Sequence, residues 1–214
     1  MQCVFIHGMG PGPSSWDGVI ANIQEVMPLD AVVINLWQLL DGKKITYDNL
    51  HTAFSEHLMS LDNVKPPFNL CGLSLGGRLT LNYAADFPQN VASIMAIGTH
   101  YKTPPSQVRI QKWLFRLTPA SAFANLGLPK KDMMSLCASL AEVDLSQKVK
   151  KISCTASILY GEKDSKLIKE AANYFVENIP NAKLGSVANA GHQVNIENPV
   201  ELAQKIIEFF GTNR

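Results

Sequence analysis

A serine, an aspartate and a histidine lie in an order along the chain that could support nucleophilic catalysis. Ser74 is the central residue of the pattern G-x-S-x-G at residues 72–76. A serine hydroxyl is a weak nucleophile, so it needs a general base, and that base needs an acid to orient it. His192, which follows Asn-Ala-Gly, is the candidate base, and Asp164, which follows Gly-Glu-Lys, is the candidate acid. Together they predict a catalytic triad.

The elements around these residues are expected to bring them to one edge of a parallel sheet. Short apolar or β-branched runs alternate with helical patterns, and most runs are apolar throughout, as in strands that helices cover on both faces. The candidate residues follow the third, fifth and sixth of the expected strands. The predicted strands are Gln2–Ile6, Ala31–Leu36, Phe68–Leu73, Ala92–Ile97, Thr155–Tyr160 and Ala182–Val187. The predicted helices are Ser14–Val26, Tyr47–Leu61, Leu75–Asp86, Lys166–Asn178 and Pro199–Phe210.

Loops that follow parallel strands meet at one edge, which is where open α/β sheets place their sites. Ser74 lies between a predicted strand and a predicted helix, the setting of a nucleophile elbow. Gly72 and Gly76 leave room there for close packing of the strand against the helix. The Leu75 N–H would lie at the N-terminus of that helix, where unpaired N–H groups and the helix dipole favour negative charge.

Residues 101–151 interrupt the alternation, because they read as helical and contain no predicted strand. A connection between strand and helix normally has about two to six residues. We therefore predict a core of residues 1–100 and 152–214, with a helical cap of residues 101–151 inserted in it. Between residues 102 and 150, eight basic residues stand against three acidic ones. A solvated helix surface is the simpler explanation. A positive rim that attracts an anionic or carrier-bound substrate is the alternative.

Three further residues are candidates for binding a substrate. His100 follows the fourth predicted strand at the same edge as Ser74, and a structural role is its alternative. Trp113 and Met133 belong to an apolar set in the cap, which could form an adaptable acyl pocket or simply pack on the core. The set comprises Trp113, Leu114, Phe115, Phe123, Leu126, Met133, Met134 and Leu136.

Composition and spacing argue against several other classes of protein. The 214 residues are 46% hydrophobic with a net charge of +1, as in one soluble domain that does not bind nucleic acid through bulk charge. No apolar run reaches the roughly 20 residues of a membrane span. The start of the chain shows no export signal and the four cysteines have no paired spacing, so we expect a cytoplasmic protein with free thiols.

The same residues predict no cofactor and no metal. The glycines at residues 8–12 resemble a dinucleotide-binding turn, but Pro13 stands where that turn needs glycine. There is no H-E-x-x-H motif and no cysteine cluster, which argues against a metal site. The sequence does not indicate an oligomeric state.

Taken together, the chain resembles small cap-bearing esterases of the α/β-hydrolase superfamily, such as the pimeloyl-carrier methyl esterases. Four landmarks match in order: His-Gly-Met-Gly at residues 7–10, the elbow at Ser74, the Gly161–Asp164 turn, and His192 with Glu-Asn-Pro at residues 197–199. The resemblance implies an α/β-hydrolase fold, with the backbone N–H of Met9 as an oxyanion donor beside that of Leu75. The chain begins at the family's third strand, so we expect about six parallel strands and no N-terminal hairpin.

We therefore predict a cofactor-independent serine hydrolase that acts on a small carboxylic ester with an apolar acyl part. Two alternatives stay open. Arg78 completes Ser-x-Gly-Gly-Arg, which occurs in the menaquinone-pathway lyase of this superfamily and also among hydrolases, and Arg109 and Arg116 could assist such a lyase. Whether Arg78 faces the pocket or packs beneath the elbow would discriminate. The second alternative is a non-catalytic binding protein on the same fold.

Overall fold

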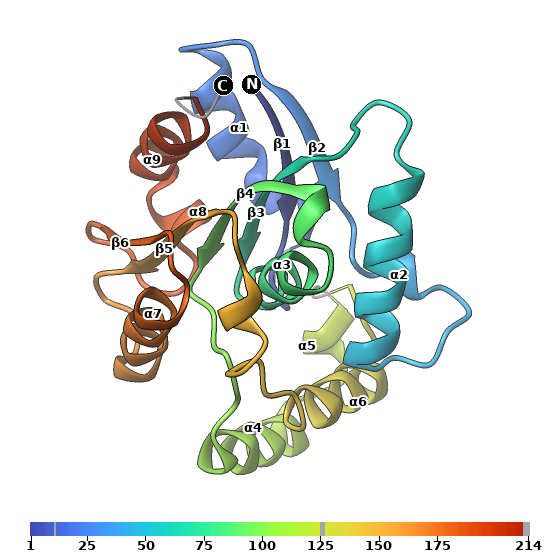
Figure 1. The fold of residues 1–214 in the computed structure, drawn as a ribbon. Coiled ribbons are helices and arrows are strands. Elements are labelled where there is room, and N and C mark those ends of the chain that lie inside the picture. The colour runs from blue at the N-terminus through green and yellow to red at the C-terminus, as the bar shows by residue number, and fades with distance from the viewer. Residues whose placement is uncertain (11, 125–126, 212–214) are drawn as a thin grey trace.

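Six parallel strands form one sheet in the order β2-β1-β3-β4-β5-β6 (Figure 1). The computed structural model describes residues 1–10, 12–124 and 127–211. Since all strands run the same way, the loops after them leave from one edge, the carboxyl edge. The strands are β1 (Gln2–Ile6), β2 (Asp30–Ile34), β3 (Phe68–Leu73), β4 (Val91–Ile97), β5 (Thr155–Gly161) and β6 (Ala182–Val187).

Helices cover both faces of this sheet, and β1 shows why its residues are apolar throughout. Cys3 and Phe5 are buried in the cluster on one face, and Val4 and Ile6 are buried in the cluster on the other, because successive side chains of a strand point to opposite faces. On the first face lie α1 (Asp17–Gln24), α8 (Val194–Glu197) and α9 (Pro199–Gly211). On the second face lie α2 (Tyr47–Ser60), α3 (Leu75–Asp86) and α7 (Lys166–Asn178).

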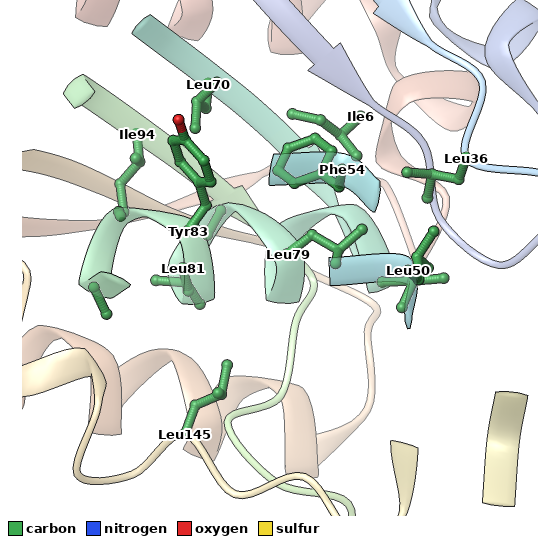
Figure 2. Packing of buried hydrophobic residues seen from close by; sticks show 14 of the residues in the cluster. Ile6, Leu36, Leu50, Phe54, Leu70, Leu79, Leu81, Tyr83, Ile94 and Leu145 are labelled. Carbon is green, nitrogen blue, oxygen red and sulfur yellow. The ribbon is translucent and has the colours of Figure 1, made fainter. Parts of the chain in front are cut away.

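The larger cluster centres on α3, the helix that follows the serine. Figure 2 shows Tyr83 of α3 gathered with Phe54 of α2 and with Leu70 and Ile94 of the sheet. The rings of Phe54 and Tyr83 meet edge to face with centroids 5.9 Å apart, a favourable geometry for aromatic pairs. Because α3 is packed on all sides, its N-terminus is a rigid support for the elbow.

Two predicted elements differ from expectation by two residues or more at an end. The strand predicted at Ala31–Leu36 is β2, and it ends at Ile34 because the Leu36 N–H donates to Nε2 of His7 (3.1 Å) instead of continuing the ladder. The helix predicted from Ser14 begins with a 3-10 turn and becomes α1 only at Asp17.

In the described part of residues 101–151, the range that we call the cap segment, three α-helices connect β4 to β5. Figure 1 shows α4 and α6 at the end of the sheet opposite the N-terminus, beyond the carboxyl edge. Hydrogen bonds from the Tyr47 N–H to Ser139 Oγ and from Ser135 Oγ to the Ile45 carbonyl, both 2.8 Å, join α6 to the core. The helices are α4 (Pro105–Leu117), α5 (Ser121–Ala124) and α6 (Lys130–Leu140).

Within the ranges described, no helix is long and apolar enough to cross a bilayer, and no three histidine, cysteine or acidic side chains gather where they could hold a metal ion. The four cysteines are free thiols. Leu126, one of the apolar cap residues, lies outside the described residues.

Candidate active site

Ser74 occupies a strained turn between β3 and α3. Its backbone angles, φ 55° and ψ −109°, lie in a region that residues with a Cβ rarely adopt. Neighbouring backbone holds the turn: the Ser74 N–H donates to the Ile97 carbonyl (2.8 Å), and Thr99 Oγ1 donates to the Ser74 carbonyl (2.7 Å). Both partners belong to the end of β4 or the loop that follows it, so the adjacent strand fixes the serine in place.

The two glycines of the elbow allow three elements to meet more closely than side chains would permit. A Cβ on Gly72 would collide with the Gly76 backbone, and a Cβ on Gly76 would collide with the Ile6 carbonyl of β1. Glycine is therefore required at both positions for β1, β3 and α3 to pack in this way. This close packing agrees with the role expected for Gly72 and Gly76 from the sequence.

The structure brings Ser74, His192 and Asp164 into one hydrogen-bonded chain. His192 Nε2 lies 3.1 Å from Ser74 Oγ, and His192 Nδ1 lies 2.9 Å from Asp164 Oδ2. Asp164 Oδ1 accepts a second hydrogen bond, 2.7 Å long, from the Ser165 N–H. These distances match those needed between a nucleophile, its general base and the acid that orients the base.

The same contacts define the protonation of the imidazole. A carboxylate can only accept hydrogen bonds, so Nδ1 of His192 carries the proton that Asp164 accepts. Nε2 is then free to accept the hydroxyl proton of Ser74. The Asp164 side chain is only 5% exposed, whereas that of His192 is 45% exposed. The acid is thus screened from water while the base is open to it.

A close approach at Gly161 joins the loops that carry the acid and the base. A Cβ on Gly161 would collide with the carbonyls of Ala190 and Gly191, which immediately precede His192. Two residues beyond Gly161, the Lys163 N–H donates to the Ala190 carbonyl (2.8 Å). The positions of Asp164 and His192 are therefore set relative to each other by backbone contacts between their loops.

The carboxylate of Glu197 holds the loop that carries His192 in place. Its Oε2 accepts from the Gly191 N–H (2.7 Å), and its Oε1 accepts from the Gln193 N–H (3.0 Å). The carboxylate thus binds the amides on both sides of His192. Sequence resemblance marked Glu197 as part of a landmark, but its contacts become apparent only in the structure.

The Glu197→Gln variant is expected to lower kcat/KM for a simple ester by about tenfold while the protein stays folded. A carboxamide oxygen can accept one of the two N–H groups, but its NH₂ group would face the other, and a hydrogen bond to a charged acceptor contributes about 1.5–3 kcal/mol. If the poorer orientation of His192 raises the activation free energy by about 1.4 kcal/mol, the rate falls tenfold.

The matched control for this variant is Glu170→Gln. Glu170 is an exposed partner of Lys166 on α7, so its substitution should leave the rate unchanged. Steady-state kinetics would measure both variants, with circular dichroism to check the fold. Equal rates for Glu197→Gln and wild type would contradict a positioning role.

Leu75 and Met9, the residues expected to supply two oxyanion-binding N–H groups, both lie beside Ser74. Leu75 is the first residue of α3, so its N–H has no acceptor within the helix, and the helix dipole adds positive potential there. Met9, in the loop after β1, lines the same cavity as Ser74 and Leu75. A Cβ on Gly8, just before Met9, would lie 3.3 Å from Ser74 Cβ, so this loop passes directly beside the serine.

His7 shapes that loop rather than exchanging protons with a substrate. It is fully buried, its Nδ1 lies 2.7 Å from the Gly8 carbonyl, and its Nε2 accepts the Leu36 N–H. Burial lowers the pKa of His7, in keeping with a neutral ring that donates from Nδ1 and accepts at Nε2. The ring thereby ties the loop that carries Met9 to the end of β2.

A cavity of about 440 Å³ opens over the serine, between the sheet edge and the cap segment. His100 lines it, as its place after β4 suggested. Burial, followed by the charge of Arg78, lowers the pKa of His100 to about 4, so its ring is neutral at pH 7. Polar side chains such as Thr99 and Gln111 also line the cavity. The apolar walls come mainly from the cap segment and α7, and they include Ile110, Leu114, Leu140 and Ile168.

Arg78 lines this cavity and also packs against the elbow. It is 4% exposed, and its guanidinium donates to the carbonyls of His100 (3.0 Å) and Leu140 (3.2 Å) and to Thr103 Oγ1 (3.2 Å). Leu140 ends α6, so Arg78 connects the elbow helix to the cap segment. Because Nε, Nη1 and Nη2 all donate to protein oxygens, this arrangement does not favour the lyase alternative.

The other two candidate binding residues do not line the cavity over Ser74. Trp113 of α4 is 62% exposed to solvent. Met133 of α6 is 1% exposed and belongs to the core cluster. Apolar character alone did not distinguish a residue that lines a pocket from one that faces solvent or core. Instead, the structure places Cys137 of α6 in the cavity wall, which no sequence motif had suggested.

Comparison with known proteins supports the assignment that the site suggests. A family model described as alpha/beta hydrolase fold matches residues 63–157. The monoacylglycerol lipase ABHD6 of Bos taurus is 25% identical over 191 residues, a match that covers 69% of this chain, and its human counterpart is 24% identical over 188 residues. The chain spans about half the length of these curated relatives, since the match covers 56% of each.

Solved structures show the same fold over almost the whole chain. The enol-lactonase from Burkholderia xenovorans LB400 superposes with a TM-score of 0.82 at 17% identity, covering 98% of this chain and 91% of that one. A thermophilic esterase from Thermogutta terrifontis gives a TM-score of 0.77 at 17% identity, covering 100% of this chain and 90% of that one. The chain thus has the α/β-hydrolase fold, and the family-model match and the curated relatives support its membership of the α/β-hydrolase superfamily.

Proposed function

We propose that this protein is a serine hydrolase that cleaves a carboxylic ester with an apolar acyl part through an acyl-enzyme on Ser74. One observation carries the proposal: the continuous chain of hydrogen bonds from Ser74 through His192 to Asp164, at the floor of a cavity. The names of the similar proteins, which include a lipase, an esterase and a lactonase, support hydrolysis of an ester.

In the first half of the reaction, Ser74 Oγ attacks the ester carbonyl carbon while His192 Nε2 takes the hydroxyl proton. The carbonyl oxygen becomes an oxyanion, to which the N–H groups of Met9 and Leu75 donate. Asp164 keeps the imidazole in the reactive tautomer and stabilises the imidazolium that forms. The carbon–oxygen bond to the alcohol then breaks, and His192 returns its proton to the departing oxygen.

In the second half, water replaces the alcohol. His192 takes one proton from a water molecule, whose oxygen attacks the acyl carbon and regenerates an oxyanion at the same two N–H groups. The bond to Ser74 Oγ breaks, and His192 returns the proton to that oxygen. The acid product leaves, and the enzyme returns to its starting state.

The walls of the cavity support an apolar substrate. Leu114 and Leu140 of the cap segment and Ile168 of α7 face it, and the neutral His100 adds a polar group without a charge. A site that is mostly apolar with a few polar groups is typical of those that bind small organic molecules.

Labelling with a fluorophosphonate tests the proposal directly. The probe reacts only with an activated serine, so the folded protein is expected to carry one adduct on the peptide that contains Ser74, located by mass spectrometry. Heat-denatured protein is the control and should not react, since the hydrogen-bonded chain is lost. A folded protein that remains unlabelled at saturating probe would refute the activated nucleophile and favour the binding-protein alternative.

A further inference from the structure

A second cavity, of about 310 Å³, lies between α4 and α6 of the cap segment. It shares two wall residues, Gln111 of α4 and Cys137 of α6, with the cavity over Ser74. The two cavities therefore adjoin at these two side chains, and we call this boundary the passage. The remaining wall residues are Val108, Phe115, Arg116, Met134 and Ala138.

The chemistry of the second cavity suits a hydrocarbon chain. Its walls are mainly aliphatic and aromatic, and Met134 is a flexible side chain that adapts to irregular apolar shapes. Burial raises the pKa of the Cys137 thiol to about 12, so the residue at the passage is neutral at physiological pH. Arg116 is exposed, so its charged end can stay in water while its aliphatic stem contributes to the wall.

The position of the passage relative to the triad indicates which part of the ester would enter it. His192 must protonate the departing alcohol, so the alcohol lies on the His192 side of Ser74. The acyl chain must leave the carbonyl carbon in another direction. The passage lies beside the loop after β1 that carries Met9, since Cys137 Sγ is 3.6 Å from Met9 Sδ. This is the side available to the acyl group.

Resting on the proposed hydrolase function, we propose that the acyl chain of the substrate runs from Ser74 past Cys137 and Gln111 into the cavity between α4 and α6. This cavity then sets the preferred acyl length. A short acyl group, such as acetyl, would occupy only the space over the serine, whereas a chain of about eight carbons would enter the second cavity.

Filling the second cavity tests this inference. The Ala138→Trp variant adds bulk at an exposed wall position, so it is expected to remain folded. For p-nitrophenyl octanoate, kcat/KM should fall roughly tenfold or more. Each methylene that no longer reaches a buried site is expected to lower kcat/KM by about fourfold. For p-nitrophenyl acetate, kcat/KM should stay within about twofold of wild type, because the catalytic cavity is unchanged.

Leu117→Trp is the matched control. Leu117, at the end of α4, is 65% exposed and lines neither cavity, so the same bulk there should change no rate. Equal losses for acetate and octanoate in Ala138→Trp would overturn the inference, as would no loss for either. Failure of the wild type to hydrolyse any of these esters would instead count against the proposed function.

Two further measurements separate the acyl chain from the alcohol and guard against a folding defect. Octyl acetate carries its long chain on the alcohol, and its hydrolysis should be unaffected by Ala138→Trp. A loss with octyl acetate but not with the octanoate ester would assign the cavity to the alcohol and refute the proposal. Met134→Ala enlarges the cavity and should shift the preferred acyl chain to greater length, and an unchanged preference would contradict the proposal.

Discussion

Replacing Ser74 with alanine is expected to lower kcat/KM for a p-nitrophenyl ester by on the order of 10⁴ to 10⁶. The hydroxyl is the protein group that forms a bond to the substrate carbon in the proposed mechanism, so its removal abolishes the acyl-enzyme. Activity that remains would come from the Met9 and Leu75 N–H groups acting on an attacking water. The predicted change is therefore in kcat, with a much smaller change in KM.

Ser60→Ala is the control for this prediction. Ser60 ends α2, and its hydroxyl only donates to the His57 carbonyl (2.8 Å), so its loss should leave kinetics unchanged. Thermal unfolding followed by circular dichroism would show that Ser74→Ala keeps its fold. Retention of more than about a tenth of the wild-type kcat would exclude Ser74 as the nucleophile, since other triads lose far more on this change.

Asp164→Asn is expected to lower kcat by about 10⁴, although the new side chain has almost the same shape. The Ser165 N–H donates to Oδ1 of Asp164, so the amide oxygen of an asparagine would keep that position. Its NH₂ group would then face Nδ1 of His192. A donor at this point favours the tautomer with the proton on Nε2, which cannot accept the hydroxyl proton of Ser74.

The tautomer itself is measurable. Nitrogen chemical shifts of a ¹⁵N-labelled His192 should place the proton on Nδ1 in the wild type and on Nε2 in Asp164→Asn. Asp62→Asn, an exchange in an exposed loop, should change neither the shifts nor the rate. If Asp164→Asn kept the Nδ1 proton and the wild-type rate, Asp164 would not be the residue that orients the base.

The positions of Ser74, Asp164 and His192 at one edge could be predicted because they depend on few features. Ser74 and Asp164 follow apolar runs that are long enough to be strands, and His192 follows the more polar run Ala182–Val187. Strands joined by helices run parallel. Parallel strands have their carboxyl ends on the same side, whatever the strand order. The side chains that share a site could thus be grouped before their distances were known.

The walls of the site could not be predicted in the same way. Periodicity shows that a helix has an apolar face, but not which part of that face meets solvent, core or cavity once two helices pack together. Trp113 and Met133 have the expected character, yet one is mainly exposed and the other lies in the core. Arg78 likewise was recognisable as a candidate, but its acceptors are carbonyls distant in sequence.

The unequal exposure of the His192 and Asp164 side chains, 45% and 5%, bears on how water reaches the reaction. Every turnover consumes one water molecule, and that molecule must arrive at the imidazole after the alcohol has gone. An imidazole open to bulk solvent is supplied by diffusion, so the cap segment need not move between the two half-reactions. The Asp164 carboxylate is almost fully shielded from solvent, so water screens its interaction with the imidazole only weakly.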